Sequence, residues 1–547
     1  MLAKTKSRGA DALALALKQA GVNRIFTLSG NHIMPVFDAV LDLDIELLHT
    51  RHEAAAVHMA DAWARVTGEP GVALVTGGPG HANAVSALYT AQMSESPVVL
   101  LSGHAPNDQL GMGAFQEMRQ ADMAATVTKA AWTCRCADAV AGDIARGRRA
   151  APAGRAGPVS LNLPTDALHA TTKIERTPDK ADFLPRPARL EAATARAALE
   201  RLAGAARPLV LAGPACMTRR GRARLAELED ACGIPVIGME SPRGMSDPSL
   251  GAFGEALAQA DCVLLLGKRL DFTLKFGKPP TFPESCEFLQ IDPEPDEIGR
   301  TRRVVGARLR LDAVADVFPA VDALVAQRSA SKPKRGWLAE VRAAVAYRPA
   351  AWASAAPGRL DRVHPVQLAR PLQEVLDSDP DSVLVADGGE IGQWAQACLN
   401  APHRLINGVG GSIGAGLPFA LGARCAERRA PVVAVMGDGT FGFHVAEMDT
   451  AVTHNLPFVA VVGNDGRWNA EYQIQLREYG AQRARGCELR SLRYDQIAQA
   501  FGAWGEHVTE AGAMPAAVRR ALASGLPACV NVMIEGLAAP QFARGAG

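Results

Sequence analysis

The chain has 547 residues, a length that at roughly 150 residues per domain predicts three or four domains rather than one. Its 58 Lys+Arg and 57 Asp+Glu leave a formal charge of +1, so no net field draws the protein to nucleic acid or to an anionic membrane. A hydrophobic content of 48% with 21% charged residues is typical of a globular protein and excludes a disordered chain.

The cysteines and the N-terminus bear on the cell compartment. Ten cysteines are scattered along the chain, and the close pair Cys134 and Cys136 fits neither a zinc knuckle nor a Cys-x-x-Cys redox motif. The basic and apolar start resembles a secretory signal, but Lys18 and Gln19 interrupt it and no small-residue cleavage site follows. No stretch approaches the ~20 apolar residues of a membrane span. We therefore expect a soluble, cytoplasmic protein with no membrane and no nucleic-acid partner.

The first third alternates short β-branched runs with helical stretches. Strands are predicted at 24–29, 45–50, 72–77, 97–103 and 158–164, with a helix from about 52 to a stop signal at Gly68 and another from about 81 to 93. This alternation predicts a parallel sheet with helices on both faces. We place a first domain at 1–170, followed by a polar, proline-bearing linker to about 188.

The rest of the chain repeats this pattern twice. Strands predicted at 208–213, 235–238, 262–267 and 287–292 define a central domain at 189–325, and residues 326–360 form a break rich in Ala, Ser, Lys and Pro. Strands at 382–388, 431–439, 458–465 and 527–534 define a third domain at 361–535. The predicted fold class is α/β, with three doubly wound parallel-sheet domains, of which the first and third are candidates for an ancient duplication.

Polar residues follow two neighbouring predicted strands of the third domain. Gly437-Asp438-Gly439-Thr440 ends one strand, and Gly463-Asn464-Asp465-Gly466 ends the next, 26 residues further on from Asp438 to Asn464. That spacing is about one strand-helix-strand unit, so both side chains are expected side by side at the carboxyl edge of the sheet. Two oxygen donors beside glycines suit Mg²⁺ holding a diphosphate, although turn formation alone also explains such glycines.

The segment from GDG to GND closely resembles the cofactor-binding motif of thiamine-diphosphate enzymes. In that family a pair of asparagines ends the motif; here the first is Gly463 and the second, the metal ligand, is Asn464. The resemblance implies that the side chains of Asp438 and Asn464 and the backbone carbonyl of Gly466 ligate Mg²⁺. It places the diphosphate against Gly437, Gly439 and Thr440.

The same family needs a glutamate in its N-terminal domain, and Glu53 stands at a predicted strand-to-helix turn. The resemblance implies that Glu53 hydrogen-bonds the aminopyrimidine N1′ and so activates the cofactor. A zinc site is excluded because HEAAAVH places His52 and His58 six residues apart, whereas a helical HExxH site needs four. Taken alone, Glu53 is also a favoured acid at a helix N-terminus.

Further segments are similar to the acetolactate synthase-like branch of that family. Residues 77–83, with a Gly-Pro-Gly turn, and Ala114-Phe115-Gln116-Glu117 match its motifs, and Gln116 thereby faces the thiazolium and the substrate. By the same resemblance the Gly411 carbonyl accepts the 4′-amino proton, and Ile413 props the cofactor into a bent shape. Gly389 and Glu390, after a predicted strand, help to hold the diphosphate, unless they form an ordinary turn.

Substrate choice is less legible in the sequence. His32 lies in a loop that lines the active site in the family, and a histidine at that place resembles benzaldehyde lyase more than acetolactate synthase. The alternative is an ordinary histidine in a surface loop. The order of Trp468, Asn469 and Glu471 differs from the acetolactate synthase pattern. Residues 267–272 lie where related enzymes bind FAD or the nucleotide of coenzyme A, so FAD is left uncertain. The Gly- and Ala-rich C-terminus is either a frayed tail or a closing lid.

The resemblance implies an acetolactate synthase-like lyase or transferase that uses thiamine diphosphate and Mg²⁺ to make or break a carbon-carbon bond next to a carbonyl, on 2-keto acids. The expected catalytic residues are Glu53, Gln116 and His32. The alternatives are a 2-hydroxyacyl-CoA or benzaldehyde-type lyase or carboligase acting on an acyl-CoA or a 2-hydroxy ketone, and an inactive, cofactor-binding regulatory protein. Because Glu53 and the metal loop lie in different domains, the family's homodimer or homotetramer with shared active sites is expected.

Overall fold

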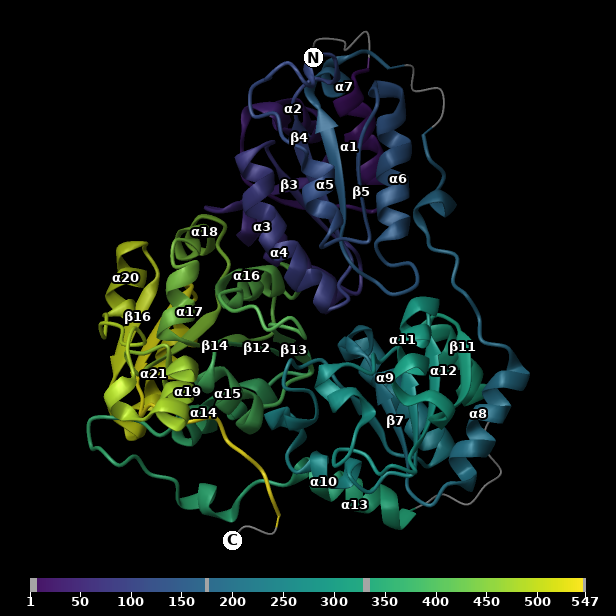
Figure 1. Ribbon diagram of the computed structural model, residues 1–547. Helices are drawn as coiled ribbons and strands as arrows, with labels where there is room; N and C mark the ends of the chain where they lie inside the picture. Colours follow the sequence, from purple (N-terminus) through teal and green to yellow (C-terminus); the bar gives the residue numbers. More distant parts are fainter. Residues whose placement is uncertain (1–6, 173–176, 328–334, 545–547) are drawn as a thin grey trace. The chain divides into compact units, whose positions relative to one another are not determined.

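Three parallel β-sheets form the scaffold of the computed structural model, which describes residues 7–172, 177–327 and 335–544 (Figure 1). The chain divides into two units by contacts between residues. Unit 1 comprises Met1–Arg186 with Leu421–Ala426, and unit 2 comprises Pro187–Ala420 with Glu427–Gly547. The α/β fold class with three parallel sheets is confirmed.

Unit 1 contains a six-stranded sheet in the order β2-β1-β3-β4-β6-β5, parallel throughout. Its strands are β1 Arg24–Thr27, β2 Glu46–His49, β3 Gly71–Val75, β4 Val98–His104, β5 Ala130–Thr133 and β6 Val159–Pro164. Its helices are α1 Gly9–Gln19, α2 Met34–Val40, α3 Glu53–Thr67, α4 Pro79–Met93, α5 Gln120–Ala125, α6 Val140–Ala150 and α7 Thr165–His169. Strand β5 was not predicted, because its four residues are only partly buried and carry no β-branched run.

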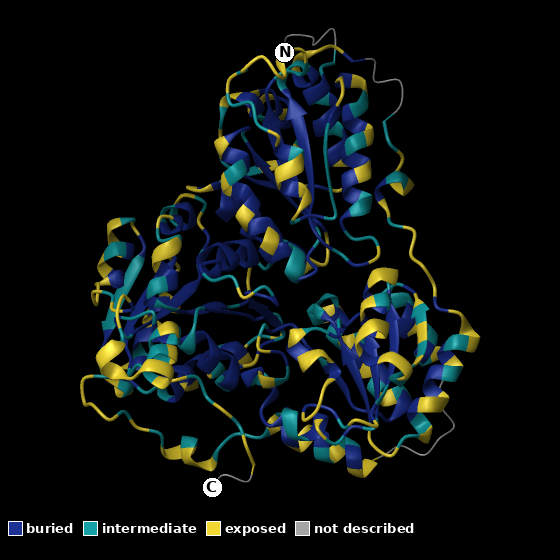
Figure 2. Ribbon diagram, in the orientation of Figure 1, coloured by how far each residue is buried: buried dark blue, intermediate teal, exposed yellow. Residues whose placement is uncertain are grey.

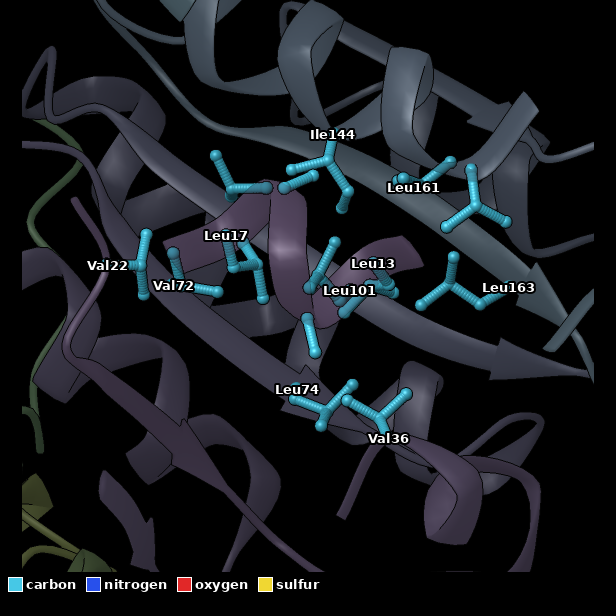
Figure 3. Close-up of a cluster of buried hydrophobic side chains, with 14 of the residues drawn as sticks. Leu13, Leu17, Val22, Val36, Val72, Leu74, Leu101, Ile144, Leu161 and Leu163 are labelled. Carbon is cyan, nitrogen blue, oxygen red and sulfur yellow. The ribbon is translucent and has the colours of Figure 1, made fainter. Parts of the chain in front are cut away.

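The core of unit 1 explains why the first helix forms where it does. Leu13 and Leu17 lie on one face of α1 and pack over Leu74 and Leu101 of the sheet (Figure 3), all of them fully buried. Burying each such side chain stabilises the fold by about 1.5–3 kcal/mol. The buried strands beneath the helices are visible in Figure 2. Helix α3 stops as predicted at Gly68, which adopts a left-handed conformation with φ of 79°.

The central sheet of unit 2 has the order β11-β10-β9-β7-β8. Its strands are β7 Pro208–Ala212, β8 Val236–Gly238, β9 Cys262–Leu266, β10 Glu287–Asp292 and β11 Leu309–Val314. The helices here are α8 Ala192–Gly204, α9 Arg219–Cys232, α10 Phe253–Leu257, α11 Pro295–Val305, α12 Val317–Ala326 and α13 Arg335–Ala346. Helix α13 lies inside the expected break at 326–360, so that expectation is wrong for this stretch. The spacing of Trp337, Val341 and Ala344, all buried, was hidden by the alanine-rich composition.

The second sheet of unit 2 has the order β13-β12-β14-β15-β17-β16. Its strands are β12 Val383–Asp387, β13 His403–Ile406, β14 Val432–Gly437, β15 Val459–Asn464, β16 Trp504–Val508 and β17 Ala528–Met533. The helices of this part are α14 Pro365–Asp377, α15 Glu390–Cys398, α16 Gly416–Ala426, α17 Asp438–Phe443, α18 Glu447–Thr453, α19 Asn469–Tyr479, α20 Tyr494–Ala500 and α21 Met514–Ala523. Counted along the chain, its strand order repeats that of the unit 1 sheet, as a duplication would produce.

None of the helices within residues 7–172, 177–327 and 335–544 combines the length and the apolar character that crossing a bilayer requires.

Candidate active site

The predicted metal ligands stand together at the edge of the second sheet of unit 2. Strands β14 and β15 pair in parallel with Gly437 opposite Gly463, which puts Asp438 and Asn464 next to each other, as predicted from their spacing. Both side chains are buried. Asp438 Oδ2 and Asn464 Oδ1 have no hydrogen-bond partner among the residues that the structure describes. An unsatisfied buried oxygen costs about 1–3 kcal/mol, and a hard cation would satisfy both, so the pair fits Mg²⁺.

Two residues that the sequence analysis missed orient Asn464. Its Nδ2 donates to the carbonyl of Leu492 at 3.0 Å and to Asn531 Oδ1 at 3.2 Å. Asn531 is itself fixed, because its Nδ2 donates to the same Leu492 carbonyl at 3.2 Å. These bonds commit the amide nitrogen of Asn464 and leave its oxygen for another ligand. The Gly466 carbonyl, the third predicted ligand, accepts the N–H of Leu489 at 2.7 Å and keeps a second lone pair.

The charges of this loop also suit a cation. Burial raises the pKa of Asp438 to about 6, against the lowering effect of backbone hydrogen bonds. Burial, and then the neighbouring Asp438, raise the pKa of Asp465 to about 7. Two carboxyl groups close together disfavour each other's charged forms. A bound divalent cation would favour the charged forms instead.

A small cavity beside this loop gathers most of the predicted diphosphate-binding residues. It is lined by Gly389, Glu390, Ile413, Gly437, Asp438, Gly439, Thr440 and Asp465, among others. A Cβ added at Gly439 would lie 2.5 Å from the ring of Trp468, and one at Gly389 would lie 2.8 Å from Ala470. Glycine is therefore required at both positions, as expected of a cradle around phosphate. Burial raises the pKa of Glu390.

Asp387, at the end of β12, holds the segment that carries Ile413. Its buried carboxylate accepts the N–H groups of Gly416 at 2.7 Å, of Gly414 at 3.0 Å and of Gly388 at 2.6 Å. Burial raises the pKa of Asp387 to about 6, while these bonds lower it. Asp387 ends the strand predicted at 382–388, and this bracing role was not predicted. Gly411 does not line the cavity, although it belongs to the same segment.

In unit 1, Glu53 is the first residue of α3 and is 8% exposed. Its Oε2 accepts a hydrogen bond from Asn83 Nδ2 at 3.0 Å. The helix N-terminus is capped by His52, whose ring accepts the N–H of Ala54 at 3.1 Å. The carboxyl group of Glu53 is therefore directed to Asn83 and to the turn at Gly80, where an added Cβ would lie 3.3 Å from Oε1. Asn83 is the last residue of the 77–83 segment, and its contact with Glu53 was not predicted.

Gln116 borders the same turn. A Cβ added at Gly78 would lie 2.7 Å from the Cβ of Gln116, so the Gly-Pro-Gly turn and the Gln116 segment pack against each other. Gln116 has a left-handed φ of 57°, which is strained for a residue with a side chain. Its buried Oε1 has no hydrogen-bond partner within the described part of the chain. Strain and an unpaired amide oxygen are both typical of a residue held for a ligand.

The surface-loop interpretation of His32 is wrong, because the side chain is only 4% exposed. Its Nδ1 lies 3.0 Å from Thr76 Oγ1, and its ring stacks on Phe115 with 6.0 Å between centroids. Burial lowers the pKa of His32, and His104 adds to this effect. His32 and Gln116 thus meet through Phe115, the neighbour of Gln116.

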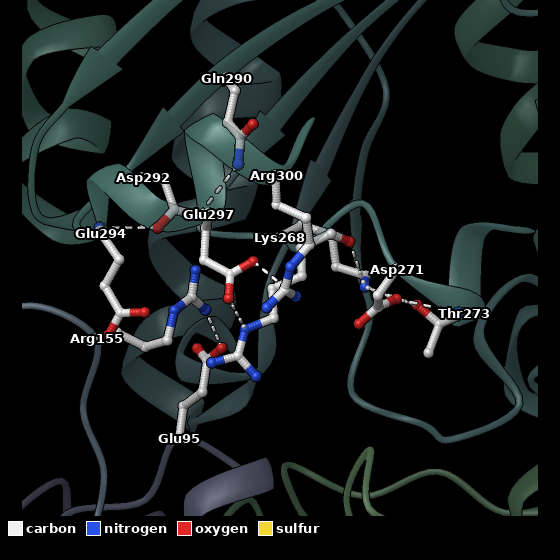
Figure 4. Close-up of polar contacts among 11 residues, drawn as sticks. Glu95, Arg155, Lys268, Asp271, Thr273, Gln290, Asp292, Glu294, Glu297 and Arg300 are labelled. Atoms are coloured by element: carbon white, nitrogen blue, oxygen red, sulfur yellow. Dashed lines mark hydrogen bonds and ion pairs between the residues drawn. The ribbon is translucent and has the colours of Figure 1, made fainter. Parts of the chain in front are cut away.

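The loop at residues 267–272 of the central sheet, where FAD was left uncertain, contains the buried Lys268 (Figure 4). Lys268 Nζ donates to Thr273 Oγ1 at 2.7 Å and to the carbonyl of Arg269 at 3.0 Å, and lies 3.4 Å from Asp271 Oδ1. Gln290 donates to Asp292 Oδ2 at 3.4 Å on the neighbouring strand end. The ammonium group is thus compensated within its own loop.

The C-terminal segment is not frayed between Gly536 and Ala538. Trp394 Nε1 donates to the carbonyl of Ala538 at 3.0 Å, and Asn469 and Gln473 donate to the carbonyls of Leu537 and Gly536 at 3.1 and 3.3 Å. Because Asn469 also lines the cavity beside Asp438, this segment packs beside the candidate site.

Comparisons with known proteins agree with this geometry. Family models described as thiamine pyrophosphate enzyme match at three places: the N-terminal TPP binding domain at residues 7–123, the central domain at 195–324 and the C-terminal TPP binding domain at 387–532. The chain belongs to the thiamine pyrophosphate enzyme family. A probable acetolactate synthase of Mycobacterium bovis is 33% identical over 542 residues, covering 96% of this chain and 95% of its own.

Relatives named 2-hydroxyacyl-CoA lyase are nearly as similar to this chain as those named acetolactate synthase. A 2-hydroxyacyl-CoA lyase 2 of Bos taurus is 31% identical, covering 91% of this chain and 84% of its own, and that of Caenorhabditis elegans is 28% identical over 97% and 90%. The expected membership of the acetolactate synthase-like branch of thiamine-diphosphate enzymes is confirmed.

Proposed function

We propose that this thiamine-diphosphate enzyme uses Mg²⁺ and catalyses acetolactate synthase-like carbon-carbon bond chemistry on small 2-keto acids. The observation that supports the metal is the pair of buried, unpartnered oxygens on Asp438 and Asn464 beside a glycine-lined cavity. The relatives named acetolactate synthase support the reaction class.

Each predicted residue has a task that its contacts permit. Bound thiamine diphosphate supplies a nucleophilic carbon and an electron sink for a bond next to a carbonyl. Asp438, Asn464 and the Gly466 carbonyl hold the metal, and the backbone at Gly437, Gly439 and Thr440 surrounds the diphosphate.

The remaining residues face the organic part of the cofactor and the substrate. Ile413, on the segment braced by Asp387, would support the cofactor, and the Gly411 carbonyl would accept a hydrogen bond from its 4′-amino group. Glu53 would hydrogen-bond the aminopyrimidine N1′, Gln116 would hydrogen-bond the substrate oxygen, and His32 would hold or move a proton there.

A 2-hydroxyacyl-CoA or benzaldehyde-type lyase is the second candidate. Burial of His32, its contact with Thr76 and its lowered pKa favour a neutral imidazole that accepts a proton from a hydroxyl group, the proton that a 2-hydroxy substrate must lose. The relatives named 2-hydroxyacyl-CoA lyase support the same reading.

We further propose a cytoplasmic homodimer or homotetramer with shared sites. Glu53 belongs to unit 1 and Asp438 to unit 2, so one protomer can supply the activating acid and its partner the metal loop. The ten cysteines, all of which the structure describes and none of which is in a disulfide, support a reducing compartment such as the cytoplasm.

One experiment separates these functions. The protein loaded with thiamine diphosphate and Mg²⁺ is incubated in parallel with pyruvate, benzoin and a 2-hydroxyacyl-CoA, and products are identified by mass. Acetolactate from pyruvate supports the first proposal, and aldehyde from either other substrate supports the second. Glu53→Gln is expected to abolish turnover and to leave cofactor affinity within a few-fold. Turnover by Glu53→Gln at the original rate would contradict the role of Glu53, and no turnover of any substrate would favour the inactive regulatory alternative.

A further inference from the structure

The loop that carries Gln116 is tied together by one carboxylate. Glu117 Oε1 accepts the N–H of Gly111 at 2.6 Å, and its Oε2 accepts the N–H groups of Gly113 and Ala114, each at 3.1 Å. The N–H of Glu117 returns a bond to the Ala114 carbonyl at 3.0 Å. Three backbone amides therefore converge on a single side chain, an arrangement that forms an anion-binding concavity.

The backbone around Glu117 could not hold this shape by local preference. Gly111 and Gly113 have φ of 80° and 79°, and Gln116 has φ of 57° although it carries a side chain. Between β4 and α5, where every residue is described, the regular structure consists of one short 3₁₀ turn, Asn107–Gln109. Met112 and Phe115 are 77% and 68% exposed, so core packing does not fix the loop tip. A loop with few buried contacts opens easily unless polar bonds close it.

The far end of the loop is anchored separately. Gln120, fully buried at the start of α5, accepts the N–H of Gly78 at 2.8 Å and donates to the Gly103 carbonyl and to Asn162 Oδ1, each at 3.0 Å. Gln120 thereby fixes the Gly-Pro-Gly turn against the end of the loop. Gln116 lies within the span from Gly111 to Glu117 that the Glu117 carboxylate closes, four residues before this anchor.

We propose that Glu117 is a positioning residue: by binding the amides of Gly111, Gly113 and Ala114 it holds Gln116 in its left-handed conformation at the active site. This inference rests on the proposed role of Gln116 at the substrate. The backbone bonds hold the pKa of Glu117 below its usual range, so the acceptor is charged at neutral pH and its bonds are charge-assisted.

The test compares Glu117→Gln with a matched control, Asp122→Asn. Asp122 lies just after the loop, in the first turn of α5, and its exposed carboxylate accepts a hydrogen bond from Arg119 Nε at 2.6 Å. Because an amide offers one acceptor oxygen, Glu117→Gln cannot keep both groups of bonds. Hydrogen exchange of the 110–118 segment should accelerate at least tenfold in Glu117→Gln and stay unchanged in Asp122→Asn. Glu117→Asp, which keeps the charge but is one methylene shorter, should fall between them.

The kinetic readout uses the substrate identified above. Glu117→Gln should lower kcat/KM roughly ten- to hundredfold, the loss expected for a displacement of about 1 Å at a reacting group, with thiamine-diphosphate affinity unchanged. Unchanged exchange, or accelerated exchange with unchanged kcat/KM, would overturn the inference. Gln116→Ala distinguishes failure of the proposed role of Gln116 from failure of the inference about Glu117. If Gln116→Ala turns over normally, the proposed role of Gln116 fails. If Gln116→Ala is impaired while Glu117→Gln is not, only the positioning role of Glu117 fails.

Discussion

Replacing Asp438 by Asn should separate the stability of the empty protein from its response to metal and cofactor. Burial raises the pKa of Asp438 to about 6, so at pH 7.5 its ionised, buried carboxylate destabilises the folded state of the metal-free protein. The empty Asp438→Asn variant should therefore unfold at the same or a higher temperature than the original chain. The stabilisation on adding MgCl₂ and thiamine diphosphate should be largely lost, because the site loses its charged ligand.

The size of this loss follows from linkage. Ligands at about a hundred times their Kd stabilise the folded state by about 2.7 kcal/mol, which is roughly 5–11 °C in Tm at ~2–4 °C per kcal/mol for a domain of ~150–250 residues. Loss of a metal ligand should weaken binding at least as much as the ~100-fold upper range for residues that only support ligands. At the same concentrations the stabilisation then falls to about 0.4 kcal/mol, a shift of roughly 1–2 °C.

Thermal unfolding followed by near-ultraviolet circular dichroism, with and without both ligands, measures these shifts. Glu447→Gln is a suitable control, because Glu447 is equally buried in the same sheet domain, accepts the Thr450 hydroxyl at 2.7 Å and does not line the cavity. It should keep the full ligand-dependent shift, whatever its own Tm. A shift in Asp438→Asn as large as in the original chain would refute the assignment of Asp438 as a metal ligand.

Three further outcomes are expected. Asn83→Ala removes the 3.0 Å hydrogen bond to Glu53 and should lower kcat/KM roughly tenfold in steady-state assays, equivalent to about 1.4 kcal/mol. The control Ser86→Ala, on the same helix, should leave kcat/KM unchanged. Equal kcat/KM values for the two variants would contradict a role for the Asn83–Glu53 contact. Gly414→Ala adds a Cβ 2.5 Å from the Phe443 ring at a φ of 95° and should weaken thiamine-diphosphate binding at least tenfold by calorimetry, whereas Gly442→Ala, with open space, should bind normally. Burial lowers the pKa of His81 to about 4, so between about pH 6.5 and 4 the unfolded chain binds a proton that the folded chain does not. The neutral His81 therefore contributes about 3 kcal/mol to the free energy of unfolding above pH 6.5, and this contribution is lost as the pH falls towards 4. Urea unfolding at pH 7.5 and 4.5 should show a loss of stability that is smaller in His81→Gln, and an identical loss in both proteins would contradict this reasoning.

The juxtaposition of Asp438 and Asn464 could be predicted from local pattern. Residues 438 and 464 are separated by one strand-helix-strand unit, and parallel strands end at the same edge, so spacing alone brought Asp438 next to Asn464. The start of α3 near Glu53 and its stop at Gly68 likewise follow from the acid at the helix N-terminus and from the glycine signal. The three-sheet α/β class follows from the same periodicities.

The orientation of these side chains was decided by contacts between residues distant in sequence. Asn531 turns the amide of Asn464, Asn83 bonds Glu53, and the amides of the Ile413 segment converge on Asp387. Periodicity reports which face of an element is apolar, not which distant partner a polar group meets, so none of these bonds could be predicted.

The same limit explains what the sequence misplaced. Whether His32 is exposed depended on Phe115, more than eighty residues away, and helix α13 became visible only when Trp337 was found buried against the central sheet. By itself the sequence determined the α/β class, the strand-end motifs, the family and the strands other than β5, β11, β13 and β16, because each is encoded within one or two elements. The tertiary structure alone decided which oxygens are left unpaired and which loops are held, because burial and hydrogen bonding are properties of the assembled fold.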